Sequence, residues 1–345
     1  MLKPYFCTLA TFVIVLAMAS DVVAKTFSAS ADSSPAIAAP PDPASVLGNE
    51  SCVKCHASEI QVWKNTPHAK TFDELHRRPE AKQIASKLGL QSIKNEGRCV
   101  ACHYTQQAQP GGSPHVMAGV SCESCHGAAK HWVDVHQDYG GEGITRLSET
   151  PEHRMARIAK SVSAGMRNPA NVYAVAQSCL RCHTTADEQL VNVGGHSPGS
   201  LDFEFVSWSQ GTIRHNFVRS DGKSNDVSDP KRIRVMFVAG MIAELESSLR
   251  ATAVATEKAT YGVTVAKRGA RAGARLKSVA AKINSPTLDQ VVAVFAGVTL
   301  KLNNKAELIQ AADRVAELGY RFAEITDGAT LESLDTFIPS AKRYK

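Results

Sequence analysis

The pattern Cys-x-x-Cys-His occurs four times in this chain of 345 residues. In each copy, two thiols separated by two residues can form thioethers with the two vinyl groups on one edge of a haem, and the adjoining imidazole can then bind the iron. Four copies predict four covalently bound haems c. The attachment residues would be Cys52, Cys55, Cys99, Cys102, Cys122, Cys125, Cys179 and Cys182, and the first iron ligands would be His56, His103, His126 and His183.

Three other uses of paired cysteines fit the pattern less well. Zinc sites do not require a histidine directly after each of four cysteine pairs. A redox dithiol normally needs one Cys-x-x-Cys in a βαβ setting. Disulfides suit an exported chain, but the motifs use every cysteine except Cys7, which lies in a predicted leader. The spacing therefore favours haem.

The remaining histidines decide how each iron is closed. A second imidazole gives a coordinatively closed iron suited to electron transfer, whereas a missing one leaves room for a small ligand. Their number exceeds what four irons need, so it does not show which irons are closed. These histidines are His68, His76, His115, His131, His136, His153, His196 and His215.

Two runs around the motifs carry a family resemblance. The run Cys52–His68, with Trp63 and the sequence TPHAK at its end, and the run Gly119–Gly127, GVSCESCHG, resemble the tetrahaem cytochrome c554 family of ammonia-oxidising bacteria. The resemblance covers about Gly48–His183, and the C-terminal segment has no counterpart in it.

The resemblance implies a set of crossed ligands. His136, ten residues after the third motif histidine, would pair with His56, and His68, twelve residues after the first, would pair with His126. Such ligation would join distant motifs through iron and stabilise the fold.

The partner of the fourth motif histidine, His183, does not follow cleanly from the family. We take His215 for this role, and His196, in a Gly-Gly-His loop near the motif, is the alternative. His76, His131 and His153 are expected to be structural or exposed.

The second iron, on His103, is five-coordinate in the family. His115 and Met117 lie close enough in sequence to compete for the free position. If it stays open, a small nitrogen or sulfur oxide such as nitric oxide could be reduced there, with Tyr104, Glu96 or His115 as the proton donor.

Electron transfer is the leading functional hypothesis, and no catalytic residue is assigned. The resemblance implies a periplasmic shuttle that accepts electrons from a hydroxylamine-oxidising enzyme and passes them to a membrane or soluble cytochrome. Reduction of a small oxide at the iron on His103 is the alternative.

The charge of the chain argues against a nucleic-acid-binding protein. A net charge of +6 with dispersed Lys and Arg does not resemble a nucleic-acid-binding surface, and it suits an acidic redox partner better. Lys267, Arg271 and Arg275 recur every four residues, so they share a helix face that we interpret as solvated rather than as a docking site.

The first residues predict export. Lys3, the apolar run Phe6–Ala19 and the small residues ending at Ala24 form a signal-peptide pattern, residues 1–24, and the run is shorter than the roughly 20 residues of a spanning helix. Val291–Leu300 is also too short. We expect a periplasmic or otherwise exported protein without a transmembrane span after cleavage.

The rest of the chain divides into four predicted parts. They are a flexible linker at 25–47, a tetrahaem domain at 48–217, a turn-rich linker at 218–230 and a helical hairpin or bundle at 231–345. Apolar residues recur at helical spacing in Met236–Tyr261, Val263–Ile283, Leu288–Leu302 and Leu308–Phe322. The expected fold class is mainly α, with short helices and long loops around four haems before the bundle.

Overall fold

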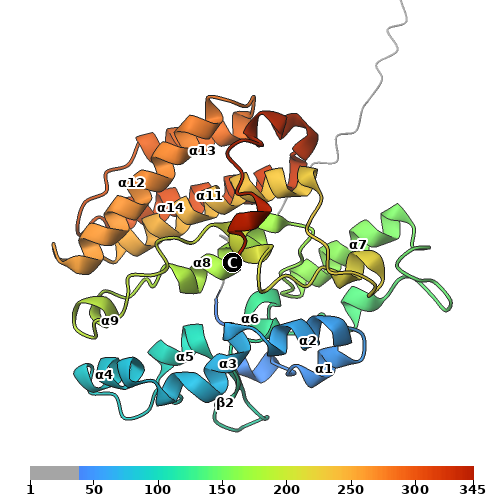
Figure 1. Cartoon of the computed structure of the whole chain (residues 1–345), viewed down its shortest axis with the longest axis horizontal. Coiled ribbons are helices and arrows are strands. Elements are labelled where there is room, and N and C mark those ends of the chain that lie inside the picture. Colours follow the sequence, from blue (N-terminus) through green and yellow to red (C-terminus); the bar gives the residue numbers. More distant parts are fainter. Residues whose placement is uncertain (1–38) are drawn as a thin grey trace, which may run out of the picture. The chain divides into compact units, whose positions relative to one another are not determined.

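Short helices joined by long connections precede a bundle of longer helices (Figure 1). The computed structural model describes residues 39–345, so the predicted signal peptide at 1–24 and most of the predicted linker at 25–47 lie outside the described residues. The mainly helical fold class is confirmed. No helix in the described range is both long and apolar enough to cross a membrane.

The first part contains one small hairpin among its helices. Strands β1 (Thr105–Gln107) and β2 (His115–Ala118) pair antiparallel, with an irregularity after Thr105. The helices are α1 (Glu50–Val53), α2 (Ala57–Lys64), α3 (Pro67–Glu74), α4 (Pro79–Lys87), α5 (Gly97–His103), α6 (Cys122–His126), α7 (Pro151–Ser163), α8 (Val172–His183), α9 (Glu188–Asn192) and α10 (Phe205–Ser209).

Three of the four Cys-x-x-Cys-His motifs end a helix. Helix α5 ends at His103, α6 ends at His126 and α8 ends at His183. One helical turn brings the two cysteines of a motif to the same side as the histidine that follows them. The first motif differs, because α1 stops at Val53 and His56 is the N-cap residue of α2.

The bundle consists of α11 (Pro230–Ala253), α12 (Thr260–Ala280), α13 (Pro286–Ala296) and α14 (Lys305–Ile325). Helix α11 packs against α8, α12 and α14, and it is buried along most of its length. A helix covered on all sides needs no polar face, which explains the unbroken apolar stretch at 235–243. It begins before the predicted start at Met236 because the Asp229 side chain accepts the N–H of Arg232 and Pro230 opens the first turn.

One hydrophobic core crosses the predicted boundary at 218–230. It joins Tyr173 and Leu180 of α8 and Phe205 of α10 to the inner faces of the bundle. Gly319 of α14 permits this contact, since a Cβ there would lie 2.2 Å from a ring carbon of Tyr173. The described residues accordingly form one compact unit.

A buried carboxylate fixes the same contact. Glu246 of α11 accepts hydrogen bonds from the Tyr173 hydroxyl at 2.5 Å, from the Gln177 amide at 3.0 Å and from Arg250 at 2.8 Å. Its side chain is 1% exposed, and Arg250 also pairs with Asp313 of α14. Polar groups from three helices are thus linked to one another inside the core.

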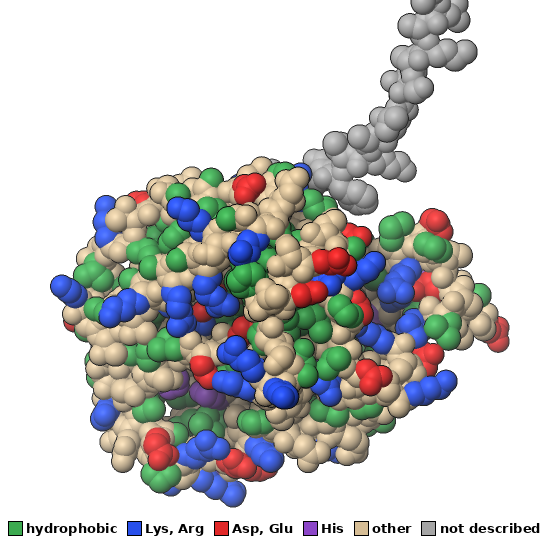
Figure 2. Space-filling model, turned by 45° about the horizontal axis from the view of Figure 1, so that its top comes forward, with side chains coloured by type: hydrophobic (Ala, Val, Ile, Leu, Met, Phe, Trp, Pro, Cys, Tyr) green, Lys and Arg blue, Asp and Glu red, His purple; other side chains and the backbone are tan. Residues whose placement is uncertain are grey.

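The predicted basic row on α12 partly faces inward. Arg271 and Arg275 lie 3.8 and 3.4 Å from the buried Glu244 of α11, although their side chains are 53% and 38% exposed. Arg271 also donates to the Leu201 carbonyl, and Lys267 is exposed as well. Figure 2 shows Lys and Arg side chains spread over one face among neutral and acidic ones. These arginines therefore hold the fold together as well as contributing charge.

Candidate cofactor-binding site

The structure pairs each motif histidine with one histidine from outside the motifs. The ring centroids are 6.3 Å apart for His56 and His136, 6.2 Å for His183 and His68, 6.1 Å for His103 and His196, and 6.1 Å for His126 and His215. The two residues of each pair come from segments that are far apart in the sequence.

This separation matches two imidazoles that bind one metal ion from opposite sides. Two metal–nitrogen bonds of about 2 Å, plus the short distance from each nitrogen to its ring centre, give a separation of about 6 Å. Rings stacked directly on each other would be closer together. The residues present therefore fit four metal centres with two axial histidines each.

The pairs differ in two places from those predicted, one implied by the resemblance and one chosen from the sequence. The structure does bring His56 and His136 together. However, His68 lies opposite His183 instead of His126, and His215 lies opposite His126 instead of His183.

Hydrogen bonds around α3 explain the position of His68. The Thr71 hydroxyl donates to the His103 carbonyl at 2.7 Å, and the N–H of Val120 donates to the His68 carbonyl at 3.1 Å. Helix α3 is therefore fixed beside α5, and α5 in turn packs against α8, the helix that ends in the fourth motif.

The pairing of His103 with His196 was missed at the sequence level. The N–H of His196 donates to the Leu190 carbonyl, and the adjoining Gly194 lies close to Ile84 and Leu88 of α4. The two glycines allow this close approach, and the Gly-Gly-His sequence was the available signal. His115, the expected competitor, is exposed on β2.

Carbonyl and hydroxyl partners orient most of these rings through Nδ1. The Nδ1 atoms of His126 and His215 lie 3.3 and 2.7 Å from the carbonyls of Arg167 and Ile213, and Nδ1 of His183 lies 2.9 Å from the Ser200 hydroxyl. His136 and His196 make similar contacts with the carbonyls of Val133 and Ser197. An Nδ1–H that donates in this way leaves Nε2 free to bind metal.

Burial keeps the inner imidazoles uncharged. It is the main cause that lowers the pKa of His103, His126 and His183 to about 4. It also lowers the pKa of His68 and His136. Only a neutral imidazole can bind a metal ion, so these side chains are ready ligands near neutral pH.

The attachment cysteines form a spatial series. A hydrogen bond between the Cys52 and Cys122 thiols lowers the pKa of Cys52, and one between the Cys102 and Cys182 thiols lowers the pKa of Cys182 to about 7. Burial and then Cys182 raise the pKa of Cys125. The motifs are therefore neighbours in the order first, third, fourth, second.

Buried donors without protein partners lie beside the histidine pairs. Among the described residues they include Nε1 of Trp132, whose ring is 5.3 Å from His136, and Nε1 of Trp208, whose ring is 5.1 Å from His183. Nη2 of Arg268 is a third, and the same guanidinium donates to the His183 carbonyl at 2.9 Å. Such donors fit a group that carries carboxylates, as haem does, and Figure 2 shows histidines at a hollow in the surface.

A carboxylate inside the third motif was not recognised from the sequence. Glu123 is 1% exposed and accepts the N–H groups of Leu47, Gly48 and Ala129 at 2.8 to 2.9 Å. It therefore ties the segment before the first motif to the third motif, in agreement with the contact between their thiols. Nothing in the two residues between Cys122 and Cys125 indicates that Glu123 would be buried and would bind backbone N–H groups.

Comparison with known proteins supports the assignment of the first part of this site. Residues 51–127 match the family model described as cytochrome c554 and c-prime. Cytochrome c-554 of Nitrosomonas europaea is 34% identical over 117 residues, which cover 32% of this chain and 50% of that protein. No solved structure matches the chain. The resemblance to the cytochrome c554 family is thus confirmed for residues 51–127, the part of the chain that the family model matches.

Proposed function

We propose that this chain is an exported c-type cytochrome that binds four haems covalently, closes each iron with two histidines and transfers electrons between redox proteins. The observation that carries the proposal is the set of four histidine pairs, each made of one Cys-x-x-Cys-His residue and one distant residue. The matched relative spans only part of the chain, so the number of haems and the activity rest on this geometry.

Haem c, when bound, supplies a reversible one-electron couple. The residues of this chain would hold each iron between two neutral imidazoles whose Nδ1 atoms are mostly fixed by hydrogen bonds. Rigid ligands of this kind keep the same coordination in both oxidation states. The series of neighbouring attachment sites supports passage of electrons through the protein without a substrate pocket.

Reduction of a small oxide at an open iron on His103 is not favoured. That hypothesis needs a free position opposite His103, and the ring of His196 lies there at 6.1 Å.

The proposed partners are redox proteins outside the cytoplasm. The electron donor would be a hydroxylamine-oxidising enzyme or an equivalent, and the acceptor would be a membrane or soluble cytochrome. The net positive charge suits an acidic partner surface. The family match, together with the signal-peptide pattern at residues 1–24, supports a periplasmic location.

Low-temperature electron paramagnetic resonance of the ferric protein tests the proposal, combined with nitric oxide titration after reduction. The intact protein should give only low-spin signals and no nitrosyl species. His196→Ala should create one high-spin centre that binds nitric oxide, whereas His115→Ala should change neither readout. A high-spin centre in the intact protein, or no effect of His196→Ala, would contradict closure of the second site.

A further inference from the structure

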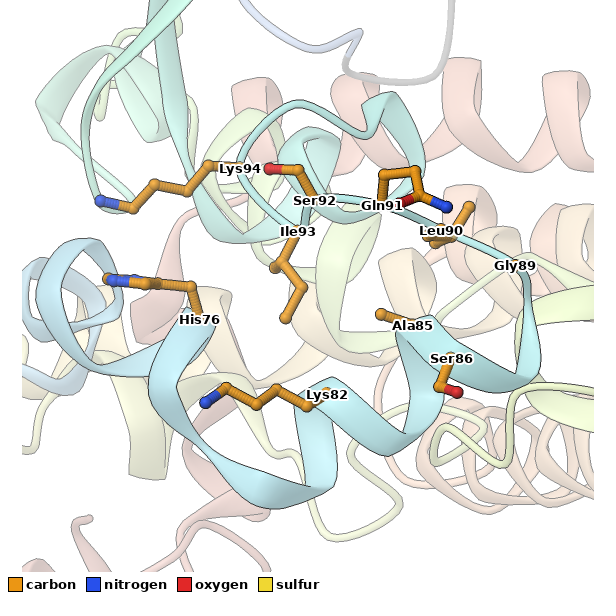
Figure 3. Close-up of a pocket in the computed structure, with 10 residues that line it drawn as sticks. All are labelled: His76, Lys82, Ala85, Ser86, Gly89, Leu90, Gln91, Ser92, Ile93 and Lys94. Atoms are coloured by element: carbon orange, nitrogen blue, oxygen red, sulfur yellow. The ribbon is translucent and has the colours of Figure 1, made fainter.

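A basic pocket lies on helix α4, away from the face that meets the His196 loop. Its volume is about 520 Å³, and its walls are α4, the loop that follows it and His76 (Figure 3). Ile84 and Leu88 of α4 face Gly194, whereas Lys82, Ala85 and Ser86 face the pocket. The pocket is therefore distinct from the histidine pairs.

Three nitrogen-bearing side chains gather at one end of the pocket. Figure 3 shows the nitrogen-bearing ends of Lys82, Lys94 and His76 on one side of the pocket, with Ala85 and Leu90 on the other. Within the described residues, neither lysine forms an ion pair with a carboxylate. The ammonium group of Lys94 lies 3.9 Å from the ring centroid of Phe72, which holds it by a cation–π contact.

The His76 ring also has a nitrogen atom available to a ligand. Its Nδ1 atom is buried and has no hydrogen-bond partner. Burial, then the charges of Lys94 and Arg77, lower the pKa of His76, and Asp73 opposes this effect. A buried ring nitrogen without a partner, next to unpaired ammonium groups, indicates a place for a ligand that brings oxygen atoms and negative charge.

We propose that this pocket binds a small, multiply charged oxyanion, either a phosphate compound or an organic dicarboxylate. Lys82 and Lys94 would supply the charge, and His76 would supply a directional hydrogen bond. The apolar wall of Ala85 and Leu90 leaves space for a ligand larger than a single phosphate.

The pocket is separated from the second motif by one layer of packed side chains. Ala85 and Ile93 of the pocket wall pack in one hydrophobic cluster with Val100 and Cys99 of α5. Bound anion would therefore add negative charge one packing layer from the second attachment site.

Isothermal titration calorimetry of the intact holoprotein tests the proposal. Pyrophosphate, phosphate and succinate are titrated separately at constant ionic strength, with chloride as the reference. Binding of either phosphate compound, or of succinate, supports the pocket and identifies the ligand class. The double variant Lys82→Gln/Lys94→Gln should weaken that binding by about tenfold or more.

A matched control removes the same charge elsewhere. Lys64 and Lys160 are exposed on α2 and α7, so Lys64→Gln/Lys160→Gln should change the affinity by less than about twofold. Unchanged haem content in both double variants shows that the fold is intact. No heat above chloride with any anion, or equal affinity in the two double variants, overturns the proposal. Binding of an acidic peptide alone would identify a protein-docking surface and would also overturn it.

Discussion

The helices that carry the first three motifs and the bundle α11–α14 have very different interiors. Near the second motif, the buried apolar cluster consists of Ala85, Ile93, Val100 and Tyr104. The bundle, in contrast, shares one continuous apolar core with α8 and α10. The difference teaches that the bundle, α8 and α10 bury their apolar side chains against one another, whereas we expect the region of the first three motifs to depend for its stability on what its histidines and cysteines bind.

The largest predicted effect is on hydrogen exchange after loss of haem, which should differ strongly between the two regions. In Cys122→Ser/Cys125→Ser, amide hydrogens of α5 and α6 should exchange at least about a hundredfold faster, because metal binding supplies folding free energy there. Those of α11 and α14 should stay protected, as measured by hydrogen exchange with mass spectrometry. Equal loss of protection in both regions would show that the bundle also depends on haem. His115→Ala is the control.

The second prediction concerns the buried carboxylate at the junction of the two regions. Glu246→Gln removes the charge that pairs with Arg250 and accepts from Tyr173, so it should lower the free energy of unfolding by about 3 kcal/mol. Urea denaturation of the holoprotein measures this. Glu317→Gln breaks an exposed pair with Arg314 and should cost less than about 1 kcal/mol. Equal effects would mean that Glu246 does not couple the helices.

A smaller effect is expected from the close approach of α14 to α8. Gly319→Ala forces a methyl group against the ring of Tyr173, and overpacking of this kind costs about 1–3 kcal/mol. Gly297→Ala is the comparison, since the Val294 carbonyl oxygen would lie 3.6 Å from the new carbon, an ordinary contact distance. Thermal denaturation should separate the two variants, and similar midpoints would show that the junction can adjust.

The smallest predicted effect is on the pH dependence of stability, and it comes from a carboxylate in the region that carries the motifs. Hydrogen bonds from Arg157 are the main cause that lowers the pKa of Glu149 to about 2. Because the unfolded chain binds this proton more readily, the stability contributed by the ionised carboxylate is present above pH 4.5 and is lost as the pH falls toward 2. Arg157 also donates to the His136 carbonyl, so the effect reaches a histidine pair.

Urea midpoints at pH 5 and pH 3 measure this contribution. Glu149→Gln should lose less stability between the two pH values than the unmodified chain does. Glu142→Gln, in an exposed loop, should behave like the unmodified chain. An identical pH response in Glu149→Gln would contradict the assignment.

Local patterns predicted much of this fold. The Cys-x-x-Cys-His motifs and the helical spacing after residue 230 are visible in short windows of sequence, and the mainly helical class follows from them. The shared core was not visible, because the division at residues 218–230 marks a change of composition and says nothing about what Tyr173 and Phe205 contact.

The histidine partners were harder to predict for the same reason. Whether His68 faces His183 or His126 depends on how α3 is fixed beside α5, which no local pattern encodes. The burial of Glu123 depends likewise on a segment far from it in the chain.

The four histidine pairs also have a topological consequence. Every pair joins one residue at or before His126 to one residue at or after His136. The four stretches of chain that the pairs enclose therefore all contain the short segment between these two histidines. No pair can be closed by a nearby stretch of chain, and such non-local contacts slow folding. A single peptide-bond cleavage between residues 127 and 135 would therefore leave two fragments that remain linked at four separate points.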